Sequence, residues 1–168
     1  IARVAAKSVQ QYIFDHEHED VRKLALSKKE ILGVGPAVLA EQIRGRKKAK
    51  EKLPSYYRTQ GIVYPPGINL EQCSSEQTAA FKASVVQKHL DTKLTSCADL
   101  TGGFGVDSIA FSKICKAVHT VDPNESLLDI AKHNHTLLGA TNIFYHSITA
   151  ENFLLQTEGR FEFIYIDP

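Results

Sequence analysis

The sequence contains little of several residue types on which large classes of proteins depend. It has no Met and no Trp, only 3 Cys, and a formal net charge of +1 over 168 residues. The widely spaced Cys73, Cys97 and Cys115 form neither a zinc-knuckle pattern nor a disulfide framework, which favours a reducing cytoplasm. A net charge this close to zero gives no global attraction to nucleic acid or to a membrane, so any such attraction must be local.

Long apolar runs and a leader pattern are also missing. No run approaches the roughly 18 apolar residues that a membrane-spanning helix requires, and no signal-peptide pattern opens the sequence. The chain begins at Ile1 and ends at Asp167-Pro168, directly after an apolar run, so we expect it to be a segment of a longer protein. We also predict no metal site, because His16 and His18 in DHEHED would lie on different faces of a helix.

Two stretches precede the part of the sequence that carries motifs. Apolar residues recur at helical spacing near the start, for example Val9, Tyr12 and Ile13, and we predict an N-terminal helical region over residues 1–53. Residues 54–72 are rich in Pro, Gly and Tyr, which predicts an extended connector rather than a packed element.

From residue 73 onward, short apolar runs alternate with helical patterns. Ser74 followed by Gln77 forms a capping box that predicts the start of a helix. The predicted strands are 94–100, 117–121, 143–146 and 161–166, and the predicted helices between them are 106–116, 125–138 and 150–155. This alternation indicates βαβ units, so we predict an α/β, Rossmann-like, mostly parallel sheet over residues 73–168 that continues beyond its fourth strand.

The glycine turn, residues 101–105 (TGGFG), joins the first predicted strand to the helix that follows it. Glycines admit positive φ and remove the Cβ that would block a ligand, and the amides opening the helix would point at that ligand. Asp122 ends the second predicted strand, where a carboxylate can accept both hydroxyls of a ribose. The dinucleotide fingerprint G-x-G-x-x-G/A fails at Ser108, so the pattern indicates a nucleoside cofactor without specifying a dinucleotide.

Taken together, the motifs of residues 70–168 resemble those of class I S-adenosylmethionine-dependent methyltransferases. Asp99 with the glycine turn is similar to that family's first motif, and Asp122-Pro123 to its second, with the acid on ribose and the next side chain against adenine. The helix pattern A-x-x-N-x-x-x-x-G at 131–139 is common in the family, and Asp167-Pro168 resembles the start of its D-P-P-x motif. The resemblance implies S-adenosyl-L-methionine as the cofactor.

A narrower resemblance is carried by IVYPPGINLEQCSSEQTA, DLTGGFGVDSIAFSK and FIYIDP. These stretches are similar to a bacterial group of predicted RNA methyltransferases that carry a THUMP-like domain and are related to trimethylguanosine synthases. Relatives place a Thr or Ser, here Ser74, beside the cofactor; many place an Asp on the adenine amino group where Thr149 stands here, and a hydroxyl accepts that bond less strongly. The implied cofactor-binding residues are Ser74, Asp99, Thr101, Gly102, Gly103, Gly105, Asp122, Pro123 and Thr149.

The implied catalytic residues are Asp167 and Pro168. If a nitrogen accepts the methyl group, the Asp167 carboxylate and the Pro168 carbonyl would accept its hydrogens and stabilise its developing positive charge. We do not expect this segment alone to be an active enzyme.

The basic run, residues 44–58 (RGRKKAKEKLPSYYR), contains Glu51 as its one acid and two adjacent tyrosines. Cations near aromatic rings suit RNA, although a solvated helix face explains the run equally well. The residues predicted to bind RNA are Arg44, Arg46, Lys47, Lys48, Tyr56 and Tyr57. We therefore expect a cytoplasmic methyltransferase acting on a nitrogen of a tRNA or rRNA base; the alternatives are a methyltransferase of proteins or small molecules and a non-catalytic nucleotide-binding module.

Overall fold

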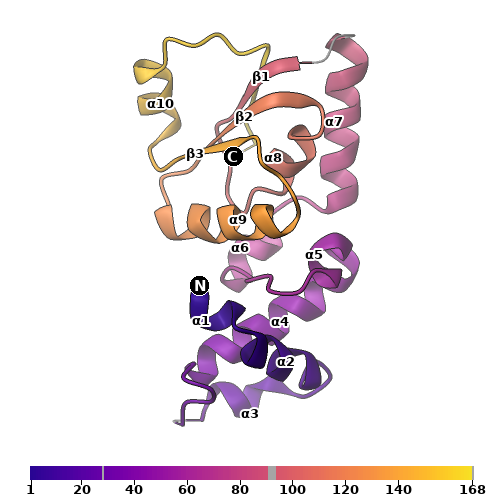
Figure 1. The fold of residues 1–168 in the computed structure, drawn as a ribbon, viewed down its shortest axis with the longest axis vertical. Helices are drawn as coiled ribbons and strands as arrows, with labels where there is room; N and C mark the ends of the chain where they lie inside the picture. Colours follow the sequence, from indigo (N-terminus) through magenta and orange to yellow (C-terminus); the bar gives the residue numbers. More distant parts are fainter. Residues whose placement is uncertain (28, 91–93, 168) are drawn as a thin grey trace. The chain divides into compact units, whose positions relative to one another are not determined.

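The computed structural model describes residues 1–27, 29–90 and 94–167 (Figure 1). The chain divides into two compact units, an N-terminal unit of Ile1–Gln72 and a C-terminal unit of Cys73–Pro168. Within the described residues, no helix is long and apolar enough to cross a membrane.

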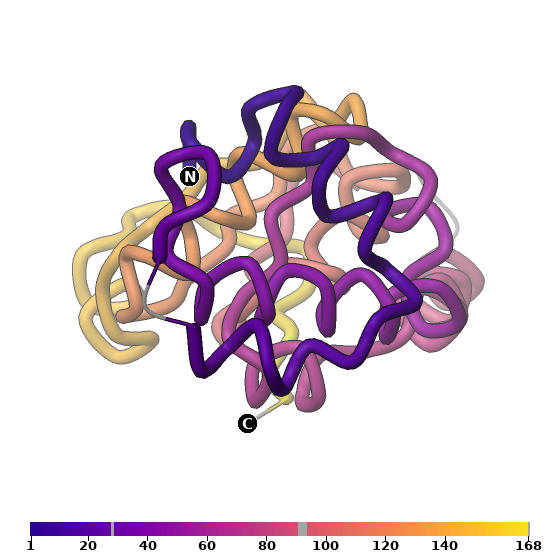
Figure 2. The backbone as a smooth tube through the Cα atoms, turned by 90° about the horizontal axis from the view of Figure 1, so that it is seen from below, coloured from indigo at the N-terminus to yellow at the C-terminus, as the bar shows by residue number. Residues whose placement is uncertain are grey.

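The N-terminal unit is helical, and its backbone forms a series of helices joined by short connections (Figure 2). Helix α4 begins with Pro36 directly after Gly35, a position where the missing N–H of proline would have had no helical partner. On α4 the buried residues Leu39, Ile43 and Ala49 recur at helical spacing and form the apolar centre of the unit. Its helices are α1 (Ala2–Ala5), α2 (Lys7–Asp15), α3 (Val21–Ala25), α4 (Pro36–Lys52), α5 (Pro54–Arg58) and α6 (Gly67–Gln72).

The prediction of an extended connector over residues 54–72 is wrong. Much of this stretch is helical, because Pro54 occupies the first turn of α5 and Gly67 begins α6. The segment between the two helices is bound to α4: the Gln42 side chain donates to the Tyr64 carbonyl at 2.8 Å and accepts from the Tyr64 amide at 2.8 Å. The tyrosines and aliphatic residues between the turn-forming residues supply enough apolar surface to pack; the buried ones are Tyr56, Ile62, Val63, Tyr64 and Leu70.

The C-terminal unit contains a parallel sheet with the strand order β3-β2-β1-β4. This topology confirms the predicted α/β, Rossmann-like fold class. In the register of the sheet, Asp99 lies opposite both Thr120 and Tyr165, and Val121 lies opposite His146. The elements are α7 (Glu76–Leu90), β1 (Leu94–Asp99), α8 (Val106–Phe111), β2 (Cys115–Val121), α9 (Glu125–Leu137), β3 (Ile143–His146), α10 (Ala150–Gln156) and β4 (Phe163–Tyr165).

Side chains alternate between the two faces of this sheet, as the period of a strand requires. On one face, Phe111 of α8 makes edge-on ring contacts with Phe163 and Tyr165 of β4, with ring centroids 5.1 Å apart in both pairs. On the other face, Ala98 and Val121 pack against Phe153 of α10. β1 and β2 pair side by side in parallel, and their carboxyl ends form the edge at which the predicted site residues lie.

Candidate functional site

The glycine turn lies flat against the end of β2, and its glycines are sterically required. The Gly102 amide donates to the Val121 carbonyl at 2.9 Å, and a Cβ at this position would collide with the Thr120 hydroxyl. Gly103 and Gly105 have φ values of +51° and +80°, which favour glycine. A Cβ at Gly105 would also lie 2.6 Å from Nε2 of the His135 ring. Collision thus excludes a side chain at Gly102 and Gly105, and the positive φ alone favours glycine at Gly103.

Asp99, predicted to bind the cofactor, is 1% exposed and supports the turn from inside the protein. Its Oδ2 accepts from the Ser108 hydroxyl at 2.6 Å, and its Oδ1 accepts from the Thr101 amide at 3.2 Å. Burial raises the pKa of Asp99 to about 6, and the hydrogen bonds from Ser108 and Thr101 oppose that rise. Ser108, which breaks the dinucleotide fingerprint, thus has a role of its own: its hydroxyl holds the carboxylate that fixes the turn.

Asp122 is half-buried at the end of β2 and is hydrogen-bonded directly to the glycine turn. Its Oδ2 accepts from the Gly103 amide at 3.0 Å, and its Oδ1 accepts from the Asn124 amide at 2.8 Å. The Asn124 side chain caps α9 by accepting from the Leu127 amide at 3.1 Å, so Asp122 is not needed as the helix cap. Each Asp122 oxygen keeps a further lone pair for a ligand. Pro123, the second residue of this predicted motif, is exposed.

The end of β4 is brought to the same turn. The Asp167 amide donates to the Thr101 hydroxyl at 2.9 Å, which joins the predicted catalytic residue to the first residue of the glycine turn. The Asp167 side chain is 57% exposed and accepts at Oδ2 from Lys82 Nζ at 2.9 Å and from the Tyr165 hydroxyl at 2.8 Å. These hydrogen bonds, led by that of Lys82, lower the pKa of Asp167. Its predicted partner Pro168 lies outside the described residues.

Lys82 of α7 is the centre of a charged cluster that was not predicted. Its Nζ donates to the Ser74 hydroxyl at 2.9 Å and lies 3.3 Å from Oδ1 of Asp107. Burial lowers the pKa of Lys82, but its hydrogen bonds to Tyr165 and Asp167 and the nearby charge of Asp107 together raise the pKa above its usual value. Lys82 is therefore a cation held between the carboxylate of Asp107 in α8 and that of Asp167, which follows β4.

Ser74 takes part in this cluster, but the prediction that it caps α7 is wrong. The residue that caps α7 is Ser75, whose Oγ accepts from the Thr78 amide at 3.0 Å. Ser74 instead donates its hydroxyl to Oδ2 of Asp107 at 2.8 Å. Two adjacent serines give the same sequence signal, and only one of them can occupy the cap position.

Thr149 is exposed and caps α10, where its hydroxyl accepts from the Asn152 amide at 3.3 Å. His135 was not predicted as a site residue. It is fully buried next to Gly105, and its Nδ1 lies 2.9 Å from the Tyr145 hydroxyl. Burial lowers the pKa of His135 to about 4, so the ring is neutral. A signal for Asp107 was present, because it closes the motif stretch DLTGGFGVD; Lys82 and His135 depend on contacts across the fold.

The predicted RNA-binding residues have different surroundings in the N-terminal unit. Tyr56 is 1% exposed, so its prediction as a stacking surface is wrong: the ring fills the core of the unit. Arg46 Nε donates to Oε2 of the buried Glu17 at 2.8 Å, and its guanidinium lies 4.3 Å from the centre of the Tyr57 ring. The exposed Lys47 donates to the Glu19 carbonyl at 2.7 Å.

The other two cations are exposed and lie beside carboxylates. Arg44 lies 4.0 Å from Glu41, and Lys48 forms an ion pair with Glu71. Part of the basic run thus stabilises the N-terminal unit. No cluster of three or more His, Cys, Asp or Glu that could hold a metal ion is present among the described residues.

No protein-family model and no curated protein matches the sequence. Among solved structures, the chain is similar to a putative methyltransferase from Porphyromonas gingivalis W83, with a TM-score of 0.70 and 22% identity. That similarity covers 88% of this chain and 36% of the other, so the chain spans about a third of the length of this neighbour. The chain is also compared with an rRNA methylase from Streptococcus thermophilus, at 20% identity over 52% of this chain and 50% of the methylase. The TM-score of 0.43 is too low to show a common fold. The first similarity shows that the two proteins share a fold.

Proposed function

We propose that this chain is the cofactor-binding part of an S-adenosylmethionine-dependent methyltransferase that modifies a nitrogen of a tRNA or rRNA base. The sequence resemblance to the THUMP-like bacterial group supports this narrower assignment. The observation that carries the proposal is the hydrogen bond from the Gly103 amide to the Asp122 carboxylate, which ties together the two elements that a nucleoside cofactor requires.

The residues present fit that cofactor. A Cβ at Gly102 or Gly105 would collide with the surrounding side chains, and Asp122 is accessible while its own geometry is fixed by two backbone amides. Asp122 would hold the ribose hydroxyls, and the backbone of the glycine turn, which its own hydrogen bonds to Asp99, Val121 and Asp122 keep in place, would lie close to the rest of the nucleoside. Ser74 and Thr149 remain proposed contacts, the latter to the adenine. When bound, S-adenosylmethionine supplies an electrophilic methyl group.

This chain would contribute to methyl transfer by aligning the acceptor nitrogen and by stabilising the positive charge that develops on it. Asp167 is joined to the turn through Thr101, and its exposed carboxylate would accept hydrogen bonds from the attacking nitrogen. Lys82 and Tyr165 orient this carboxylate through Oδ2 and keep it ionised, which leaves Oδ1 to face the substrate. Positioning of this kind can supply roughly 7–11 kcal/mol of a barrier.

One observation favours a second candidate, methyl transfer to a protein or a small molecule. Arg46 and Tyr56 are committed to the interior of the N-terminal unit, and Lys47 and Lys48 have partners in the same unit. Under this alternative the basic run has a structural role alone.

Methyl incorporation separates the candidates. The full-length protein that carries this chain is incubated with S-adenosylmethionine labelled on the methyl group, together with total RNA or with total protein. We expect label in RNA, sensitive to ribonuclease and absent with Asp167→Ala. Label in protein would replace the RNA assignment, and absence of S-adenosylmethionine binding would remove the proposal as a whole.

A further inference from the structure

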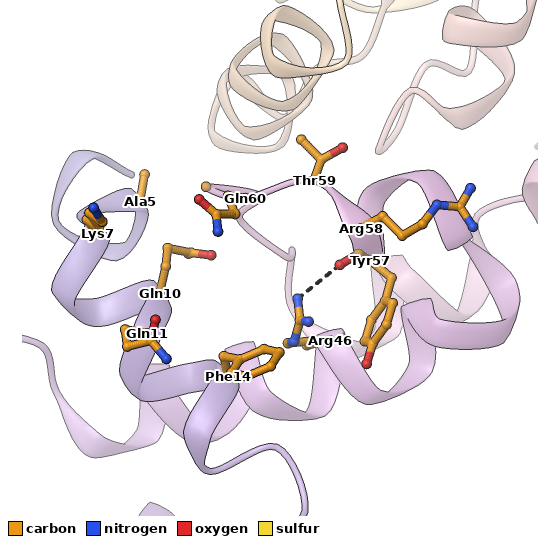
Figure 3. A pocket seen from close by; sticks show the side chains of 11 residues that line it. Ala5, Lys7, Gln10, Gln11, Phe14, Arg46, Tyr57, Arg58, Thr59 and Gln60 are labelled. Carbon is orange, nitrogen blue, oxygen red and sulfur yellow. Dashed lines mark hydrogen bonds between the residues drawn. The ribbon is translucent and has the colours of Figure 1, made fainter.

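The N-terminal unit contains a cavity of about 510 Å³ between α2 and the segment that follows α5 (Figure 3). This volume lies within the range of about 300–1,000 Å³ typical of small-molecule sites. Its lining has aromatic, amide and cationic side chains and no acidic one. No residue of the glycine turn or of the Lys82 cluster lines it, so the candidate cofactor site does not account for it.

The cavity has a rigid aromatic wall. Phe14 is 56% exposed, and the centre of its ring lies 5.3 Å from the Arg46 guanidinium. Arg46 cannot move away, because it donates to Glu17 and to the Tyr57 carbonyl at 3.0 Å. Tyr57 is held in turn through its hydroxyl, which lies 3.0 Å from Oε1 of Glu17. An exposed ring beside a fixed guanidinium is a surface on which a planar base can stack.

Hydrogen-bonding groups stand beside this wall. The Gln10 side-chain nitrogen donates to the Val4 carbonyl at 2.9 Å and to the Ile62 carbonyl at 3.2 Å, so its amide is fixed with Oε1 left as an acceptor. In Figure 3 the Gln10 oxygen is directed into the space between α2 and the Tyr57–Gln60 segment. Gln60 is exposed at the same cavity and can both donate and accept.

Two cations stand at the ends of the cavity. Figure 3 shows Lys7 on the α2 side and Arg58 at the opposite end, beyond Tyr57. Both are exposed, and among residues 1–27, 29–90 and 94–167 neither takes part in an ion pair. Cations on two sides of a stacking surface match a nucleotide that continues into a phosphate on each side, as it does inside a single strand.

We propose that this cavity binds one unpaired nucleotide of a single-stranded RNA segment, with its base on Phe14 and its flanking phosphates on Lys7 and Arg58. The inference rests on the proposed function in one respect, namely that the substrate is RNA. Phe14 replaces the buried Tyr56 as the predicted stacking surface, and the internally paired Arg46 supports the Phe14 ring. Since a base can stack on Phe14 whatever its identity, the site favours unpaired RNA over duplex with little dependence on sequence.

The test measures binding of the full chain to a fluorescent ten-nucleotide single strand by anisotropy, without S-adenosylmethionine. Phe14→Leu keeps the apolar character and removes the ring, and we expect affinity to fall about tenfold. Phe14→Tyr keeps the ring, and we expect it to bind within about threefold of the unmodified chain. Thermal melting of each variant verifies folding, and Phe14 is exposed enough for both to fold.

The charge test uses Lys7→Glu/Arg58→Glu against the matched control Arg22→Glu/Lys23→Glu, whose exposed side chains are outside the cavity lining. Both double variants change net charge equally. We expect the cavity pair to lower affinity at least tenfold and to reduce the slope of log K against log salt by about two, and the control pair to change that slope by less than one.

Equal effects of the two pairs, or unchanged binding by Phe14→Leu, would overturn the inference. Tighter binding of a duplex of the same length, or of a phosphorylated peptide, would also overturn it. None of these measurements involves methyl transfer. Failure here would therefore leave S-adenosylmethionine binding at the glycine turn untouched, and failure of that binding would leave the cavity result intact.

Discussion

The glycine turn and the basic run are both dense in polar groups, but they use them in opposite ways. In the turn, buried Asp99 and the glycines hold the backbone so that the carboxylates of Asp122 and Asp167 stay accessible at the ends of two strands. In the basic run, Arg46 turns inward to a buried carboxylate. A polar residue in the sequence therefore indicates a functional site only when its side chain is not already used in hydrogen bonds inside the protein.

The difference predicts different consequences of mutation. Substitutions of the accessible carboxylates should change ligand binding or turnover and leave stability nearly unchanged. Substitutions of the inward cation should change stability and leave S-adenosylmethionine binding unchanged. The following measurements, ordered from the largest expected effect to the smallest, sharpen or break this comparison.

Asp167→Ala should lower methyl transfer at least about a thousandfold, because it removes the group that stabilises the charge developing on the acceptor. Affinity for S-adenosylmethionine should stay within about tenfold, since Asp167 is proposed to act on the acceptor. Initial rates of the full-length protein that carries this chain measure turnover, and calorimetry measures affinity. Asp129→Ala, exposed on α9, is the control. Unchanged turnover would remove Asp167 from the mechanism.

Arg46→Ala should lower the free energy of unfolding by about 3 kcal/mol, because it leaves the Glu17 carboxylate buried without its cation. The control Arg44→Ala removes an exposed cation 4.0 Å from Glu41 and should cost less than about 0.5 kcal/mol. Urea unfolding measures both. Equal losses would show that the ion pair of Arg46 with Glu17 contributes no more to stability than an exposed ion pair does.

Gly105→Ala and Gly139→Ala separate collision from backbone strain. Both residues have φ near +80°, and only Gly105 has a side chain, that of His135, in the way of a Cβ. Gly139→Ala should therefore cost about 1 kcal/mol for its conformation, and Gly105→Ala about 2 kcal/mol more. If the two variants unfold at the same urea concentration, the contact between the turn and His135 is not tight.

His135 should make the C-terminal unit less stable in acid. Its folded-state pKa of about 4 is below the unfolded value of 6.5, so the folded state binds fewer protons and stability is lost as pH falls below that value. Between pH 7.5 and 5.5 this contribution should fall by about 1 kcal/mol, and His135→Gln should not show that part of the loss. Urea unfolding at the two pH values tests this; identical pH dependence of both proteins would contradict the burial of a neutral ring.

The sequence was most informative where local backbone chemistry decides the structure. The glycine turn, the acid at the end of β2 and the β3 strand all follow from short patterns, and the structure has β3 at the predicted Ile143–His146. The helix after the turn ends at Phe111 rather than at residue 116, because β2 already begins at Cys115.

Partners distant in sequence could not be predicted. Lys82 reaches Asp167 across 85 positions, and Arg46 reaches Glu17 across 29. No local pattern distinguishes Arg46, which is committed to a buried acid, from Arg44, which lies at the surface. For the same reason the cavity lined by Phe14 and Tyr57 emerged only when α2 and the end of α5 were brought together.

Calorimetric titration of the chain with S-adenosylmethionine tests the central claim most directly, with NAD as the competitor class and Asp122→Asn as the variant. Asparagine retains an acceptor for the Gly103 amide but has one oxygen fewer for a ribose. We predict saturable binding of S-adenosylmethionine, no binding of NAD, and at least about tenfold weaker binding by the variant. Its melting temperature should fall only slightly, because the Asn124 amide loses its acceptor while the Gly103 amide keeps one. Absence of heat with S-adenosylmethionine up to about 1 mM, or equal affinity of the variant, would contradict the assignment of this turn as a nucleoside site.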